Sequence, residues 1–217
     1  MFMEIYYDIL DKKRLAAFKR LAYFSKYGPL AGGTALAMQI GHRISVDFDI
    51  FCHQEIDNKL INKTRKNFLI SQVLVNNKDE LTFLTKDNIK ITFLYYPFKF
   101  RGKLIKTRNG PNLLGVKNIA ITKAYTLGRR NSWRDYADLY FILSQRIITL
   151  SELIKLTKSV YRELFNEKLF LAQLLYTNDI SKNEIKEVKI IKEEISLNQV
   201  KKYFKQQIDN YLKIGAK

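Results

Sequence analysis

The sequence has few cysteines and histidines, and it has no long apolar segment. Its one cysteine, Cys52, excludes an intramolecular disulfide, and the two histidines, His42 and His53, are too few for a zinc site. No basic and then apolar leader opens the chain, and no stretch approaches the roughly 18 apolar residues that cross a membrane. We therefore expect a cytoplasmic protein without a membrane span, in which Cys52 is a small core residue rather than a nucleophile.

Acidic residues are also scarce. The 217 residues contain 38 Lys and Arg but only 21 Asp and Glu, which leaves a net charge of +17. Such an excess indicates an anionic partner, with nucleic acid the leading candidate, because each phosphate contact releases counterions. Lysine-rich solvated surfaces give the same composition, so the charge supports this interpretation without deciding it.

The pattern of apolar residues divides the chain into a mixed half and a helical half. In the first half it predicts helices at 4–26, 34–41 and 58–70 and strands at 45–51, 73–75, 81–85 and 89–96. The second half reads as helices at 116–128, 134–146, 151–166, 167–176 and 196–212. We expect an α+β fold with a mixed-sheet module at 1–111 and a helical module at 112–217, and a site in the crevice between them.

Two aspartates lie close together in the strand predicted at 45–51. The two-residue period of a strand places Asp47 and Asp49 on one face, with their Cα atoms roughly 6 to 7 Å apart. Two carboxylates at this spacing can hold magnesium, which can activate a hydroxyl and neutralise charge on a leaving pyrophosphate. A half-exposed strand with a polar face would show the same pattern.

A glycine turn precedes the aspartates by about a dozen residues. Gly32 and Gly33 let the backbone approach a phosphate, and Thr34 adds a hydroxyl as an N-cap or a phosphate ligand at the start of a helix. Such a turn alone is more often a plain connection. Together with the acidic pair, it predicts a phosphate-binding turn beside a metal site.

The segment LAGGTALAMQIGHRISVDFDIF, residues 30 to 51, closely resembles the opening motif of the AbiEii/AbiGii-type nucleotidyltransferase toxins. The resemblance includes Arg43 and Ser45 as substrate-binding residues, and it implies a polymerase-β-like core followed by a helical module. It further implies transfer from an NTP with Mg2+, a toxin–antitoxin or phage-defence role with a cognate antitoxin, and the tRNA 3′ end as the acceptor in some members.

Lys123 falls on the apolar stripe of the helix predicted at 116–128. One explanation is snorkelling at the edge of the core. The other is an ammonium that binds the triphosphate, which the resemblance favours because the family's second motif matches Lys123 with Arg129 or Arg130.

Arg134 and Asp138 lie four residues apart within the apolar segment RDYADLYFIL. The plain interpretation is a helical ion pair worth a few tenths of a kcal/mol. The family's Arg-x-x-x-Asp motif instead makes Asp138 a catalytic candidate, which orients or deprotonates the acceptor hydroxyl or fixes Lys123, with Arg134 as a substrate-binding residue. Asp135 is expected to point elsewhere, as an outer salt-bridge partner.

The sequence departs from related transferases at Thr92, where a third carboxylate is expected on a later strand. Two hypotheses follow. Either a two-aspartate centre transfers nucleotides, or the chain is a basic module that kept the fold, lost catalysis and binds RNA or an antitoxin.

Overall fold

The computed structural model describes residues 4–127, 129 and 132–215. The chain divides into two compact units, at 1–115 and 116–217, and each is described here by itself. The boundary expected from the sequence was at 111/112. Within the described residues, every helix is too short or too polar to cross a membrane.

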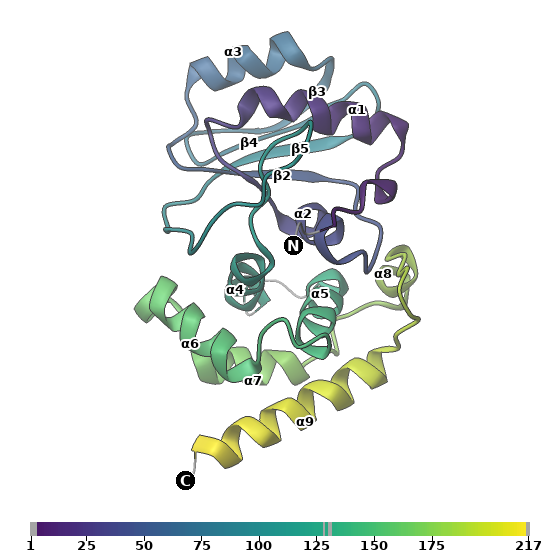
Figure 1. The fold of residues 1–217 in the computed structure, drawn as a ribbon, viewed down its shortest axis with the longest axis vertical. Coiled ribbons are helices and arrows are strands. Elements are labelled where there is room, and N and C mark those ends of the chain that lie inside the picture. Colours follow the sequence, from purple (N-terminus) through teal and green to yellow (C-terminus); the bar gives the residue numbers. More distant parts are fainter. Residues whose placement is uncertain (1–3, 128, 130–131, 216–217) are drawn as a thin grey trace. The chain divides into compact units, whose positions relative to one another are not determined.

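The first unit is built on a five-stranded mixed sheet in the order β1-β2-β5-β4-β3 (Figure 1). The strands are β1 (Leu30–Ala31), β2 (Phe48–Cys52), β3 (Ile70–Asn76), β4 (Glu80–Thr85) and β5 (Lys90–Tyr95). Neighbours β2 and β5 run parallel, and the other three pairs are antiparallel. The predicted α+β class with a mixed sheet is therefore confirmed.

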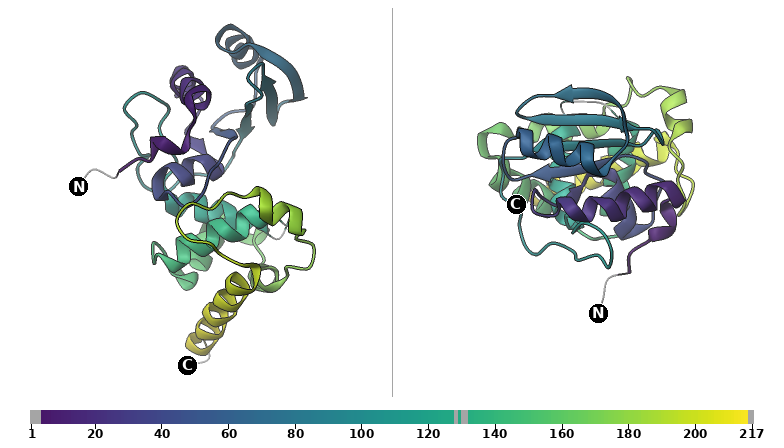
Figure 2. Two further views of the ribbon diagram at one scale, coloured as in Figure 1. Left: turned by 90° about the vertical axis from the view of Figure 1, so that its right-hand side faces the viewer. Right: turned by 90° about the horizontal axis from the view of Figure 1, so that it is seen from above.

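One face of this sheet forms the core. Helices α1 (Lys12–Leu21) and α3 (Asn58–Asn67) cover it, as Figures 1 and 2 show. Rings from the covering segments meet rings of the strands at centroid distances of 5.2 to 6.5 Å, in the pairs Phe18–Phe48, Phe24–Phe93 and Phe68–Phe83. Large apolar side chains on alternate strand positions thus fix which face is buried.

The other face carries the polar residues. In β2 the buried Phe48, Ile50 and Cys52 alternate with the half-buried Asp49 and Phe51. The predicted alternation is correct here, and it sends the Asp49 side chain away from the core.

The long N-terminal helix expected at 4–26 is shorter and interrupted. A 3-10 turn at Tyr7–Ile9 comes first, and α1 begins at Lys12 because Asp11 caps it, accepting a hydrogen bond from the Arg14 amide at 2.8 Å. The helix ends at Leu21 and continues as a second 3-10 turn, Ala22–Phe24. The apolar period alone did not reveal the cap.

The second unit is helical, as predicted. Its helices are α4 (Val116–Leu127), α5 (Trp133–Ser144), α6 (Leu150–Tyr161), α7 (Glu167–Leu175), α8 (Lys182–Glu187) and α9 (Leu197–Gly215). Fully buried rings of Trp133, Tyr136, Tyr161, Phe170 and Phe204 form its core. The short α8 was not predicted. Ser181 caps it by accepting from the Glu184 amide at 3.1 Å, and the Glu184 side chain accepts hydrogen bonds from the Ser132 hydroxyl and the Trp133 amide.

Candidate active site

Gly32 and Gly33, the two glycines of the predicted turn, are the first residues of helix α2 (Gly32–Ile40), which directly follows β1. Gly32 has φ +65°, and a methyl group added to its Cα would lie 2.3 Å from Oδ2 of Asp49. Only glycine meets both conditions. The Asp49 carboxylate therefore lies against Gly32, the first residue of α2.

Arg43 lies behind the next residue of the turn. A methyl group on Gly33 would meet the Arg43 Nη2 atom at 2.3 Å, and the guanidinium also donates to the Ile44 carbonyl at 3.0 Å. The side chain is buried. A cation at a helix N-terminus adds to the positive end of the helix dipole instead of opposing it, so this arrangement favours an anion.

Thr34 has a different position from the one expected. The N-cap of α2 is Ala31, so the prediction of Thr34 as an N-cap was wrong: the helix begins two residues earlier, at Gly32. The buried Thr34 hydroxyl donates to the carbonyl of Asp47 and hydrogen-bonds to the Ser45 hydroxyl at 2.9 Å. Both hydroxyls thus join the segment that carries Asp47 to the helix.

Asp47 and Asp49 are held in place by different structural elements. Asp49 lies inside β2, whereas Asp47 precedes the strand, which starts at Phe48 and not at Ser45 as predicted. Oδ2 of Asp47 lies 3.5 Å from the Lys90 ammonium of β5, and both side chains are partly exposed. The expectation that one strand carries both carboxylates is corrected: a strand fixes one, and a hydrogen-bonded loop fixes the other.

Thr92 occupies the position directly beside Asp49 on the neighbouring strand. Its hydroxyl hydrogen-bonds to that of Thr82 at 3.0 Å, and Thr82 donates to Glu80 at 2.5 Å. Within the part of the chain that the structure describes, no three His, Cys, Asp or Glu side chains gather as a metal site. Two carboxylates still suit magnesium if substrate phosphate oxygens and water complete its coordination.

In the helical unit, Lys123 joins two carboxylates. Its buried ammonium contacts Asp135 at 2.5 Å and Asp138 at 2.6 Å, and both aspartates are fully buried. The predicted outer position of Asp135 is wrong. A sequence signal existed, since Asp135 and Asp138 are three residues apart and share one helix face. The contact of Asp138 with Lys123 agrees with one of its expected roles, while triphosphate binding by Lys123 stays a prediction.

Two of the basic residues predicted to act with Lys123, Arg129 and Arg134, are described by the structure, and both are exposed. The exposed Arg129 lies over the Tyr125 ring at 4.1 Å and donates to the Leu164 carbonyl at 3.2 Å. Tyr125 in turn stacks on Tyr161 at 3.8 Å. Arg134 is exposed on α5, and Arg130 falls outside the described residues.

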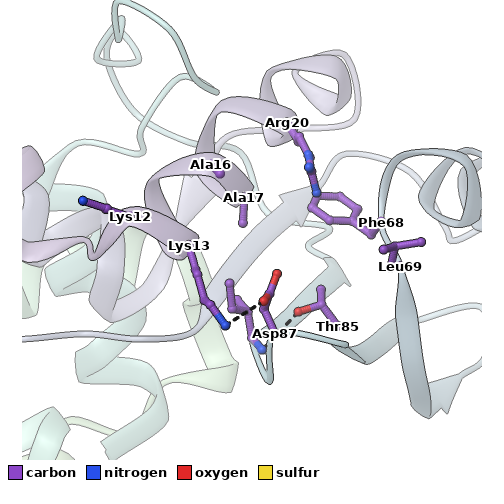
Figure 3. A pocket seen from close by; sticks show the side chains of 10 residues that line it. Lys12, Lys13, Ala16, Ala17, Arg20, Phe68, Leu69, Thr85 and Asp87 are labelled. Carbon is purple, nitrogen blue, oxygen red and sulfur yellow. Dashed lines mark hydrogen bonds and ion pairs between the residues drawn. The ribbon is translucent and has the colours of Figure 1, made fainter.

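A separate hollow of about 250 Å³ lies beside α1 (Figure 3). It is lined by Lys12, Lys13, Ala16, Ala17, Arg20, Phe68, Leu69, Thr85, Asp87 and Ile89. Lys13 is paired with Asp87 at 2.9 Å across it. None of the predicted site residues lines this hollow, so it is separate from the acidic centre formed by Asp47 and Asp49.

Comparison with known proteins identifies the family of this chain. Residues 16–111 match the family described as nucleotidyl transferase AbiEii toxin of type IV toxin–antitoxin systems. An uncharacterised protein of Aquifex aeolicus, aq_aa25, is 34% identical over 190 residues, which cover 84% of this chain and 87% of that protein. The chain belongs to the AbiEii nucleotidyltransferase toxin family. The predicted family and enzyme class are thus confirmed, and membership implies an antitoxin partner.

Solved structures share the fold of this AbiEii-family chain at low sequence identity. MenT4, the nucleotidyltransferase toxin Rv2826c of Mycobacterium tuberculosis, is similar with a TM-score of 0.59 and 16% identity, over 90% of this chain and 82% of that one. JHP933 from Helicobacter pylori gives a TM-score of 0.51 and 18% identity, over 92% and 94%. The helical half is therefore part of the shared architecture.

Proposed function

We propose that this AbiEii-family enzyme transfers a nucleotide from an NTP to a hydroxyl of RNA, with the tRNA 3′ end as the acceptor and Mg2+ as the cofactor. The observation that carries the proposal is the contact between Asp49 and Gly32. It places a carboxylate against the start of a helix whose N-terminal turn is suited to phosphate.

Asp47 and Asp49 would hold the magnesium together with oxygens of the triphosphate. The bound ion would polarise the reacting phosphate and offset the charge of the departing pyrophosphate. Around it, the amides of Gly32 and Gly33 and the guanidinium of Arg43 would contact the phosphates. Thr34 and Ser45 would position the loop that carries Asp47.

The reaction exchanges one phosphoanhydride bond of the NTP for one phosphoester bond to the acceptor. The acceptor oxygen attacks the α-phosphorus and forms a phosphodiester bond. The bond from that phosphorus to the pyrophosphate oxygen breaks, and the hydroxyl proton leaves to water. Protein groups contribute by position and electrostatics, as in other phosphoryl transfers.

The helical unit supplies further cations. Arg129 and Arg134 are exposed, and we propose that they contact the triphosphate or the phosphates of the acceptor. The Lys123 ammonium contacts both Asp135 and Asp138. We therefore assign Asp138 the task of fixing Lys123.

The test is an assay of purified protein with Mg2+, each of the four α-labelled NTPs in turn, and total tRNA or total protein as the acceptor. We expect label in the tRNA fraction, lost on chelation by EDTA, and sequencing of the product would name the nucleotide added. Label in protein alone would refute the RNA acceptor. If no acceptor is labelled and Asp49→Ala still inhibits growth, the enzymatic account fails and a binding module of this fold replaces it.

A further inference from the structure

The segment after β5 alternates aromatic and basic residues. Tyr96, Phe98 and Phe100 are interleaved with Lys99 and Arg101. Further cations follow at Lys103, Lys106 and Arg108, and no Asp or Glu occurs anywhere from 88 to 134. Interleaved rings and cations without acids are typical of surfaces that bind single-stranded nucleic acid.

Three rings of this region form a cluster with a common orientation. Tyr96 stacks on Phe51 at 4.9 Å with 16° between the planes, and on Phe100 at 5.0 Å with 9°. The Phe51 and Phe100 planes differ by 19°. Because the rings are half-buried and nearly parallel, a further flat ring can stack against the cluster in the same orientation.

The ring cluster, defined as Phe51, Tyr96 and Phe100, adjoins the acidic centre. Phe51 lies two residues after Asp49 on β2, so both side chains are on one face of the sheet, roughly 7 Å apart along the strand. The backbone amide of Tyr96 donates to the Cys52 carbonyl at 2.8 Å, which fixes the start of the basic segment beside the end of β2. A nucleotide whose sugar reaches Asp49 can therefore rest its base, or that of its neighbour, on the cluster.

We propose that the ring cluster stacks unpaired bases at the 3′ end of the RNA acceptor, while Lys99, Arg101 and Lys103 contact its phosphates. This inference rests on the proposed function for the identity of the acceptor. The three cations are exposed, as a groove that follows a phosphate backbone requires.

The base of the incoming NTP is the other source of a stacking ring. The RNA is favoured because the cations continue along the segment beyond the cluster, which suits a chain of phosphates. The proposed function already assigns the phosphates of the NTP to the glycine turn and Arg43.

The binding test uses a labelled RNA hairpin with four unpaired nucleotides at its 3′ end and the same hairpin with a blunt end, without NTP. Phe100→Leu removes a ring but keeps apolar volume, and Phe100→Tyr keeps the ring. We expect Phe100→Leu to weaken binding of the tailed hairpin about tenfold and to change the blunt hairpin little, with Phe100→Tyr close to wild type. Tyr23→Leu, an exposed ring removed elsewhere in the same unit, is the matched control.

The charges are tested by a triple variant, Lys99→Gln, Arg101→Gln and Lys103→Gln. Its control removes the same residue types from exposed positions of α3, on the opposite face of the sheet: Lys59→Gln, Arg65→Gln and Lys66→Gln. We expect the first triple variant, and not the second, to lower the slope of log K against log salt by about 2, since each single-strand phosphate contact contributes about 0.7.

The outcomes separate this inference from the proposed function. Equal binding of the tailed hairpin by wild type and Phe100→Leu, with both folded by circular dichroism, overturns the stacking proposal. A rise in the KM for NTP with RNA binding unchanged assigns the cluster to the NTP base and overturns it too. If wild type binds the tailed hairpin through the cluster but transfers no label, the proposed function fails and the RNA surface stands.

Discussion

Oδ2 of Asp49 lies so close to Gly32 that a single added methyl group would be 2.3 Å from it. The contact joins the acidic strand to the N-terminus of α2, although Asp49 and Gly32 are 17 positions apart in the sequence. It makes the glycine turn and the carboxylate one unit, so a change in either should affect the other.

Gly32→Ala should therefore abolish transfer as well as destabilise the fold. The matched control is Gly41→Ala just after the other end of α2, where φ is +62° and the atoms nearest to the added methyl group belong to the ring of Tyr6, at 3.2 Å. Both variants should lose about 1 to 2 kcal/mol of unfolding free energy from the left-handed backbone. Labelled transfer per folded molecule should fall only in Gly32→Ala. Equal activity of the two variants would show that the Asp49 contact is without consequence.

Lys90 pairs with Asp47 at 3.5 Å and should compete with the metal. Lys90→Gln is expected to lower the Mg2+ concentration that gives half-maximal transfer, by up to about fivefold, because a partly exposed pair is worth no more than about 1 kcal/mol. Lys117→Gln, which removes a lysine paired with Glu152 at 2.7 Å, should leave the Mg2+ dependence unchanged. A higher Mg2+ requirement in Lys90→Gln would contradict metal binding at Asp47.

Lys123→Met should destabilise the protein by about 3 to 5 kcal/mol, because it leaves Asp135 and Asp138 buried without their cation. Loss of activity in this variant alone would not identify a role in catalysis. Chemical denaturation followed by circular dichroism measures the effect on folding.

A variant that replaces the whole triad separates the two roles of these residues. Lys123→Met with Asp135→Leu and Asp138→Leu removes all three charges together and should recover much of the lost stability. If this triple variant folds and transfers nucleotides at the wild-type rate, Lys123 and Asp138 have no part in the reaction.

Cys52 offers a reporter for the sheet because it is the single cysteine and is buried. Desolvation by burial raises the pKa of its thiol from 9.0 to about 12, so the thiol stays protonated in the folded protein at pH 8. We expect a disulfide reagent to label the folded protein at least about a thousandfold more slowly than the urea-unfolded chain. The pKa of the thiol is higher in the folded than in the unfolded protein. The contribution of the protonated thiol to the free energy of unfolding is therefore complete below pH 9 and is lost as the pH rises from 9 to about 12. Rapid labelling of the folded protein would contradict the burial.

Local chemistry in the sequence predicted much of the first half of the site. The two glycines that begin α2, and the alternation across Phe48, Asp49 and Ile50, are set by backbone conformation and by burial of one sheet face, both of which act over a few residues. The strand nevertheless begins at Phe48, because the preceding residues are held by Thr34 through hydrogen bonds that have no periodic signature.

Contacts between distant segments were harder to predict. The pairing of Lys123 with Asp135 depends on how α4 packs on α5, which residue spacing within either helix does not specify. The ring cluster likewise brings together Phe51 of β2 and Phe100 of the segment after β5. In both cases the residue types were visible in the sequence, but their partners became clear only in three dimensions.

The rate of label transfer to tRNA by Asp49→Asn and Asp47→Asn tests the central claim most directly. The matched control is Asp209→Asn, which neutralises an exposed carboxylate on α9. With Mg2+ and the preferred NTP, we predict a loss of at least about a hundredfold in both site variants, with wild-type folding, and no change in the control. Transfer at the wild-type rate by folded Asp49→Asn would contradict the account of the acidic centre.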